Sequence, residues 1–173
     1  VVDGEIYSVR SGMTQPAALV RTTKDGKSSR LRAFSSSDGK FSAGPDGRIY
    51  WSEPVPDRRW SHRINSVIRS FDTSSGRTRS LSAAGRLSSP SVSVDGKTLT
   101  VTEYLDDGRS RVVIMDADNG DISRYISVPD SLQAVESILL RDSLYITAIS
   151  SSGYGIYSIR CPESAAGWRT ILA

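Results

Sequence analysis

The sequence predicts an all-β protein built from about four similar units, each of roughly four strands. Three observations predict it: short runs in which apolar and polar residues alternate, tight-turn motifs between the runs, and recurrence of this arrangement along the chain. Alternation at every second residue is typical of a strand with one buried face, and no stretch keeps the longer period of an amphipathic helix. We therefore expect antiparallel sheets and almost no helix.

The clearest unit lies within residues 88–128. Its turns contain the pairs and triplets of Asp, Asn and Gly that tolerate the positive φ of tight reversals. Its third run, RVVIMD, is more continuously apolar than the others, as expected for a strand covered on both faces. The expected strands are residues 91–94, 98–104, 111–116 and 122–128, and the turns between them are residues 95–96, 106–108 and 118–120.

The Asp-Gly pair that opens this unit recurs along the chain, at intervals of roughly 40–50 residues. A second landmark, D-x-x-x-G, keeps the same register at residues 72–76 and 116–120. Repeats of this length with four strands each are the signature of β-propeller blades. The pairs stand at residues 3–4, 46–47 and 95–96, with a copy lacking Gly at 142–143. The expected blades are residues 3–39 (without the innermost strand), 40–85, 86–131 and 132–172.

The turn sequences also resemble a known family. PSVSVDGK at residues 90–97, and more weakly GPDGR at residues 44–48, look like the SPDGK turn of TolB-type propeller repeats. The strand and the D-x-x-x-G turn that follow fit the same pattern, although Val92 stands where the family often has Trp. Such repeats occur in TolB, in other cell-envelope proteins and in the gating domains of prolyl oligopeptidases. The resemblance therefore implies a fold rather than a particular chemistry.

Length and composition are those of a single globular domain. The chain has 173 residues and a formal net charge of +3, without a block of like charges that would predict a nucleic-acid-binding arm. It has no apolar run of transmembrane length. Its one cysteine, Cys161, cannot form an intramolecular disulfide. Because the chain opens inside an expected strand and without Met, we expect a piece of a longer polypeptide.

The most unusual segment is EPVPDRRWSHR, residues 53–63, between the second and third strands of the second blade. Its two prolines interrupt a strand ladder, so we expect an irregular, protruding loop. Corresponding loops of a propeller open on one face, which places residues 11–16, 105–110 and 150–154 around it. Trp and Arg dominate binding hot spots and could stack on an anionic or carbohydrate ligand or anchor a protein; alternatively, the Trp covers its own blade. The candidate binding residues are Arg58, Arg59, Trp60, His62 and Arg63, with Tyr104 and Tyr154 beside the neighbouring loops.

The sequence contains no catalytic, metal or cofactor signature. His62 is the only histidine, and as a general base it would need an orienting carboxylate and a nucleophile. Residues 116–121 lack the ligand pattern of a calcium loop, and a hairpin turn accounts for them. Residues 151–155 are a glycine-rich hairpin and match neither a nucleophile elbow nor a phosphate loop. We expect no catalytic residue, no metal and no cofactor.

These observations predict a non-enzymatic binding or scaffold module of a larger protein, contacting a protein partner or a glycan but no nucleic acid. The resemblance alone places it in the periplasm or at the cell surface of a bacterium. The alternative is the gating propeller of a serine peptidase of the prolyl oligopeptidase type, or a propeller hydrolase or lyase, with catalytic residues outside this chain. We also expect an open arc whose end blades expose apolar flanks and allow self-association.

Overall fold

The computed structural model describes residues 4–57, 59, 64–161 and 169–172. These residues form 15 β-strands and no helix, arranged in four antiparallel sheets. In every sheet the strands lie side by side in sequence order, so that a short connection joins each strand to the next. The predicted all-β class and the sheet architecture are confirmed.

The first sheet has three strands and the others have four. The first sheet contains β1 (Ile6–Arg10), β2 (Ala18–Thr22) and β3 (Ser28–Ala33). The second contains β4 (Ser42–Ala43), β5 (Arg48–Pro56), β6 (Ile64–Asp72) and β7 (Thr78–Ser80). The third contains β8 (Leu87–Val92), β9 (Thr98–Tyr104), β10 (Ser110–Asp116) and β11 (Ile122–Ser127). The fourth contains β12 (Gln133–Leu140), β13 (Ser143–Ser150), β14 (Gly153–Arg160) and β15 (Arg169–Leu172).

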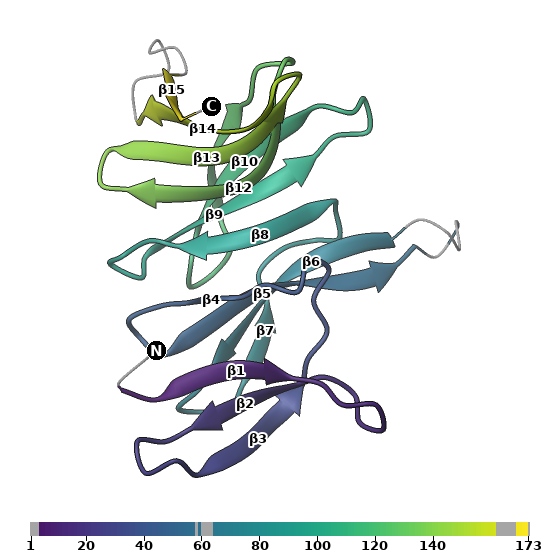
Figure 1. Cartoon of the computed structure of the whole chain (residues 1–173), viewed down its shortest axis with the longest axis vertical. Coiled ribbons are helices and arrows are strands. Elements are labelled where there is room, and N and C mark those ends of the chain that lie inside the picture. Colours follow the sequence, from purple (N-terminus) through teal and green to yellow (C-terminus); the bar gives the residue numbers. More distant parts are fainter. Residues whose placement is uncertain (1–3, 58, 60–63, 162–168, 173) are drawn as a thin grey trace.

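The sheets follow one another along the long axis of the molecule, from β1–β3 at one end to β12–β15 at the other (Figure 1). The first strand of the third sheet, β8, lies beside both β4 and β12, so the first strands of three sheets meet along one inner edge. Among the described residues, no strand of the first sheet contacts a strand of the fourth. The first and fourth sheets lie at opposite ends of the molecule (Figure 1), so the described residues form an open arc, as the sequence predicted.

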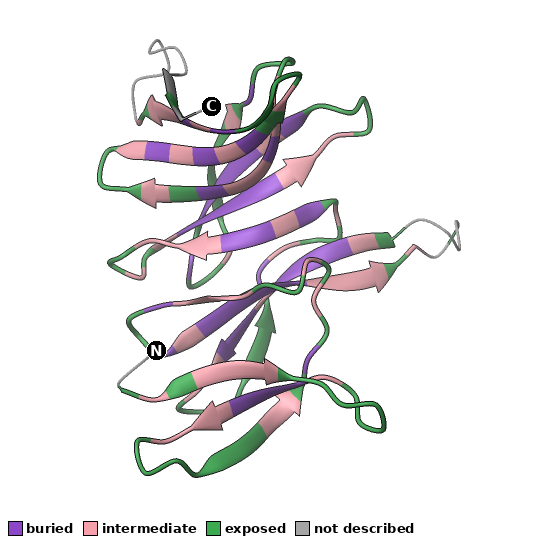
Figure 2. Cartoon of the chain, in the orientation of Figure 1, coloured by how far each residue is buried: buried purple, intermediate pink, exposed green. Residues whose placement is uncertain are grey.

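Three apolar clusters hold the sheets together, one between each neighbouring pair. Their members come from the faces that adjacent sheets turn toward each other, and Figure 2 shows buried positions alternating with less buried ones along β13. The cluster between the first and second sheets contains Leu19, Phe34, Ile49, Trp51 and Phe71. The next contains Tyr50, Ile68, Leu81, Leu87, Leu99, Val101, Val113, Met115 and Ala117. The last contains Val112, Val128, Ala134, Leu144, Ile146, Ala148 and Tyr157.

The Asp-Gly pairs at residues 46–47 and 95–96 occupy equivalent turns. Each joins the first and second strands of its sheet, and in each the Asp carboxylate accepts a hydrogen bond from the N–H two residues later: 3.2 Å from Asp46 and 3.1 Å from Asp95. Gly47 and Gly96 both have left-handed backbones, with φ of 78° and 75°. The fourth copy, which has lost its Gly, places Arg141 in this region with φ of 54°. The fourth turn thus differs from the other two: it is shorter, with Leu140 paired to Ser143, and its left-handed residue precedes the Asp instead of following it.

The sequence predicts an irregular loop that begins at residue 53. This prediction is wrong for residues 53–56, because β5 continues to Pro56. The carbonyl oxygen of Ser52 accepts a hydrogen bond from the N–H of Ser37 at 2.8 Å, on the side of β5 that faces away from β6. Backbone groups alternate along a strand, so Pro54 and Pro56 also turn their nitrogens to that side. The short strand β4 does not extend far enough to pair with these two prolines. Their missing N–H groups therefore remove no hydrogen bond to β4 or to β6.

The two ends of the arc differ in chemistry. On the fourth sheet, the face turned away from the third carries Ile138, Leu140, Ile149 and Tyr154, with exposed fractions of 40%, 41%, 38% and 68%. On the first sheet, alternation along β1 turns Tyr7 and Val9 inward and leaves Ile6, Ser8 and Arg10 facing out. The prediction of an apolar flank therefore describes the fourth sheet well, whereas the free face of β1 is mostly polar.

Candidate functional site

The structure describes three of the seven predicted binding residues, Arg59, Tyr104 and Tyr154. Arg58, Trp60, His62 and Arg63 lie outside the described residues. Arg59 is exposed, and its backbone N–H donates to the Asp57 carboxylate at 2.8 Å. Tyr154 pairs with Ile149 on the free face of the fourth sheet, away from the inner edge of the arc. Tyr104 ends β9 and is the described candidate that lines a cavity.

This cavity has a volume of about 400 Å³ and lies along the inner edge, at the side of the arc where β5 and β9 end (Figure 1). Its wall combines the start of β6, the whole first half of β8 and the connection between the first and second sheets. The polar side chains that line it are Ser37, Asp38, Lys40, Asn65, Ser66, Arg86, Ser88, Ser89 and Tyr104.

A second cavity of about 360 Å³ adjoins the first. Lys40 and Ser89 line both, and the second cavity continues past Pro90 to Glu136 and Ile138 of β12. We call the two together the axial cavities, because they follow the inner edge where β4, β8 and β12 meet.

Asp38 organises the wall shared by the axial cavities. One carboxylate oxygen accepts hydrogen bonds from the N–H and hydroxyl of Ser89, at 2.7 and 3.0 Å. The other accepts from the Ser36 hydroxyl and the Lys40 N–H, at 2.8 and 3.0 Å. Ser89 lies at a bulge in β8 and has a left-handed φ of 48°, which is costly for a residue other than Gly. Asp38 therefore stabilises strained backbone at the cavity wall, and such strain clusters at functional sites.

An ion pair between Lys40 and Glu136 crosses the inner edge. Lys40 precedes β4 of the second sheet, whereas Glu136 belongs to β12 of the fourth sheet, next to a register shift. The pair thus joins two sheets that are not neighbours in the arc. Because about half of each side chain is exposed, its contribution to stability is small. It places one positive and one negative charge at the boundary between the axial cavities.

Three hydroxyl groups near these cavities are buried without a hydrogen-bond partner among the described residues. They belong to Ser88, Thr102 and Ser137. Ser88 lines the first cavity and is the cross-strand partner of Thr102, and Ser137 lines the second cavity. Thr102 lines neither cavity; the hydroxyls of Ser88 and Ser137 can donate to or accept from a ligand once rotation about χ1 turns them into the cavities.

Sequence reasoning missed the connection at residues 36–40. The segment SSSDGK contains an Asp-Gly pair, but one outside the register of the repeated turns. Gly39 has a left-handed φ of 72°, so the pair does form a tight turn. That misplaced pair was the available signal that the connection has a local structure of its own.

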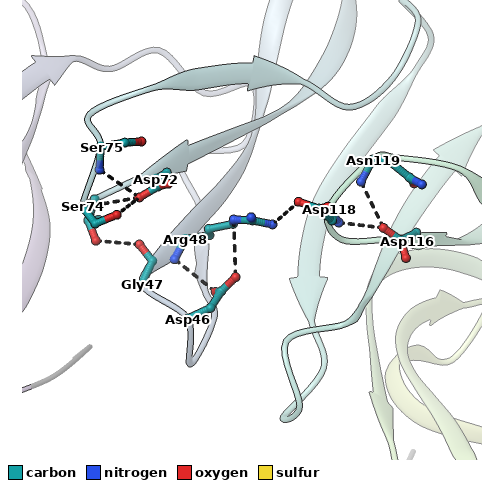
Figure 3. A network of polar contacts seen from close by, with 10 residues as sticks. Asp46, Gly47, Arg48, Asp72, Ser74, Ser75, Asp116, Asp118 and Asn119 are labelled. Atoms are coloured by element: carbon teal, nitrogen blue, oxygen red, sulfur yellow. Dashed lines mark hydrogen bonds and ion pairs between the residues drawn. The ribbon is translucent and has the colours of Figure 1, made fainter.

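A second polar network lies at the opposite ends of the strands, between the second and third sheets (Figure 3). Arg48 donates to Asp118 at 2.6 Å and pairs with Asp46 at 3.5 Å. Asp72 accepts hydrogen bonds from the N–H and hydroxyl of Ser74 and from the N–H of Ser75, at 2.8, 2.6 and 3.1 Å. These bonds, above all from Ser74, lower the pKa of Asp72, which therefore remains ionised.

Other chemistry is sparse in the described part of the chain. No three His, Cys, Asp or Glu side chains there lie close enough to hold a metal ion. Cys161 is a free, half-buried thiol, and burial raises its pKa. Thiolate reactivity is correspondingly weak.

Nor does the described part contain a helix long and apolar enough to span a membrane.

Comparison with solved structures identifies the fold. A crystal structure of the tricorn protease matches 98% of this chain with a TM-score of 0.76 and 11% identity. TolB from Acinetobacter baumannii matches 94% with a TM-score of 0.65 and 16% identity. The acylaminoacyl peptidase of Pyrococcus horikoshii matches 99% with a TM-score of 0.65 and 10% identity. The chain has a β-propeller fold. The predicted likeness to TolB-type propellers is confirmed at the level of structure.

The propeller is short relative to these proteins. The chain spans 21% of the tricorn protease chain, 40% of the TolB chain and 31% of the peptidase chain. No protein-family model and no curated protein sequence matches it. At such low identity the likeness extends to the fold, and the function has to be argued from the residues themselves.

Proposed function

We propose that this propeller is a non-enzymatic binding module that takes up an extended segment of a protein partner in the axial cavities. The observation that carries the proposal is the strained Ser89, which Asp38 holds at the wall shared by both cavities. Backbone strain at a ligand-facing position is a common feature of preorganised sites. A site whose shape is set before binding loses less conformational entropy when the ligand arrives.

The chemistry of the cavities suits polypeptide. An extended backbone presents N–H and carbonyl groups at regular intervals, and the unpartnered hydroxyls of Ser88 and Ser137 can pair with either. Tyr104 supplies an aromatic surface and Arg86 a positive charge in the lining of the first cavity. Tyr and Arg are enriched among the residues that dominate protein interfaces.

We place the module in a larger protein of the bacterial cell envelope, in the periplasm or at the cell surface. The likeness to TolB supports this location. A second candidate is a gating propeller, supported by the likeness to the tricorn protease and the acylaminoacyl peptidase. The parent gene distinguishes the two: a downstream G-x-S-x-G with later Asp and His favours a peptidase, whereas a lipoprotein signal favours an envelope protein.

Selection from a random linear peptide library displayed on phage tests the binding function. We expect enriched peptides whose synthetic forms bind the chain in solution, as measured by fluorescence anisotropy. Tyr104→Ala should weaken this binding by about ten-fold or more, because Tyr104 lines the cavity. Tyr154→Ala is the matched control: it removes the same aromatic group from the free face of the fourth sheet and should leave binding unchanged.

Three other outcomes would contradict the proposal. Binding on a glycan array without peptide binding would assign the cavities to carbohydrate. Equal effects of Tyr104→Ala and Tyr154→Ala would move the binding site away from the axial cavities. Turnover of fluorogenic ester, peptide or glycoside substrates, abolished by a substitution at His62, would make the chain an enzyme.

A further inference from the structure

We propose that the cleft between the second and third sheets, at the end of the strands opposite the predicted binding loops, binds a phosphate group. The cleft has a volume of about 180 Å³. It is independent of the axial cavities and shares no lining residue with them. Its lining residues are Arg48, Ser70, Asp72, Ser75, Arg77, Arg79 and Asp118.

Three arginines line the cleft, two of them placed there by strand register. Arg48 of β5 pairs with Asp72 of β6, and Ser70 of β6 pairs with Arg79 of β7. Arg77 precedes β7 and lines the same cleft. Cross-strand partners share a face, and all five side chains border the cleft that faces the third sheet.

The three guanidinium groups differ in what they already bind. Arg48 is engaged by Asp118 at 2.6 Å and Asp46 at 3.5 Å. Neither Arg77 nor Arg79 forms a side-chain hydrogen bond or an ion pair with any described residue. Both side chains are exposed and both line the cleft, so one anion in the cleft can contact both guanidinium groups. Each offers five N–H donors in a planar fork that suits oxyanions.

The Ser70 hydroxyl supplies a third, independent donor. Ser70 is only 6% exposed, lines the cleft, and forms no side-chain hydrogen bond to a described residue. The Ser70 oxygen is not among the buried, unpartnered polar atoms of the described residues, so it is open to the cleft, where it can donate to a ligand oxygen. Donors from Arg77, Arg79 and Ser70 approach from three positions. That arrangement favours a tetrahedral phosphate, with three acceptor oxygens, over a planar carboxylate.

The carboxylates of Asp72 and Asp118 do not neutralise the positive charges of Arg77 and Arg79. Asp118 is bound to Arg48, and Asp72 points one oxygen at the backbone of its own turn, where Ser74 and Ser75 donate to it. Both remain negative, so they orient a phosphate group toward the β7 side of the cleft, next to Arg77 and Arg79. The phosphate of a soluble monoester and that of a lipid headgroup offer the same oxygens to this site.

Titration of the folded chain with inorganic phosphate and with glycerol 3-phosphate tests the site, followed by the NMR signals of the arginine side-chain N–H groups. We expect the signals of Arg77 and Arg79 to shift, with a dissociation constant of about 1 mM or below. The double variant Arg77→Gln, Arg79→Gln should weaken binding by about ten-fold or more. Ser70→Ala, which leaves the charge unchanged, should weaken it by a smaller but measurable factor.

Arg160→Gln is the charge control, because Arg160 is exposed at the end of β14 in the fourth sheet. It should leave phosphate binding unchanged; a loss equal to that of the double variant would mean that general charge attraction is responsible, and the site would be refuted. Vesicles of phosphatidylcholine, with and without phosphatidic acid, distinguish a lipid headgroup from a soluble phosphate monoester as the ligand. Binding of phosphatidic acid vesicles that needs Arg77 and Arg79, without binding of soluble phosphate, assigns the site to headgroups. Failure of phosphate, glycerol 3-phosphate and vesicles alike refutes it.

Discussion

Gly120→Ala is expected to destabilise the fold far more than Gly76→Ala, although the two glycines end equivalent D-x-x-x-G turns. In each turn the Gly N–H donates to the carbonyl of the Asp four residues earlier, at 3.0 Å to Asp116 and 2.9 Å to Asp72. Both glycines have left-handed backbones, with φ of 82° and 69°. Any L side chain there costs about 1–2 kcal/mol, so this contribution is common to both variants.

The difference comes from packing between sheets. A Cβ on Gly120 would clash with the carbonyl oxygen of Leu81, which belongs to the backbone that follows β7 in the second sheet. A Cβ on Gly76 would meet nothing within 4 Å. Backbone cannot give way as the end of a flexible side chain can, so Gly120→Ala forces the third sheet away from the second.

Urea denaturation of the two variants measures this difference. We expect Gly76→Ala to lower the free energy of unfolding by about 1–2 kcal/mol. Gly120→Ala should lower it by about 4 kcal/mol or more, in the range of severe single substitutions. Equal losses would show that the turn of the third sheet does not pack against the second as described.

Trp51→Ala is expected to cost about 3–5 kcal/mol, the usual range for removing a buried aromatic side chain. Trp51 is fully buried in the cluster between the first and second sheets. Its ring lies 5.5 Å from that of Phe34, and the guanidinium of Arg32 lies 4.8 Å from its centroid. Large aromatic side chains fill this interface, so their loss should loosen the first sheet before the others.

Amide hydrogen exchange locates the effect. In Trp51→Ala we expect faster exchange in β1, β2 and β3, with β9 and β10 little changed. Trp51→Phe is the control: it keeps an aromatic ring, and the indole N–H that it removes has no partner among the described residues. It should cost about 1–2 kcal/mol. Uniformly faster exchange in all four sheets would contradict a separate attachment of the first.

The turns were predictable from the sequence because their causes are local. Asp46 and Asp95 bond to the backbone two residues ahead, and the glycines beside them supply the positive φ. The error at Pro54 and Pro56 has a different origin. Whether a proline breaks a ladder depends on which side its nitrogen faces, and on whether a neighbouring strand reaches that far. Neither fact is local.

The axial cavities could not be predicted for the same reason. Asp38, Ser89 and Glu136 come from the connection before the second sheet, from β8 and from β12, and they meet only once the arc has formed. The sequence places Tyr104 beside a neighbouring loop, and in the structure it lines the first axial cavity. Tyr154 was singled out on the same ground, yet strand alternation turns it to the free face of the fourth sheet.

Light scattering of the purified chain at micromolar concentration tests the central claim, that the four sheets form an open arc. The free face of the fourth sheet exposes Ile138, Leu140, Ile149 and Tyr154, whereas β1 presents Arg10. An apolar face of this kind promotes association, and two copies can meet through it without opposing charges. We expect a dimer or larger species, and a monomer for the variant Ile138→Asp, Ile149→Lys. A wild-type chain that remains monomeric would contradict the open arc.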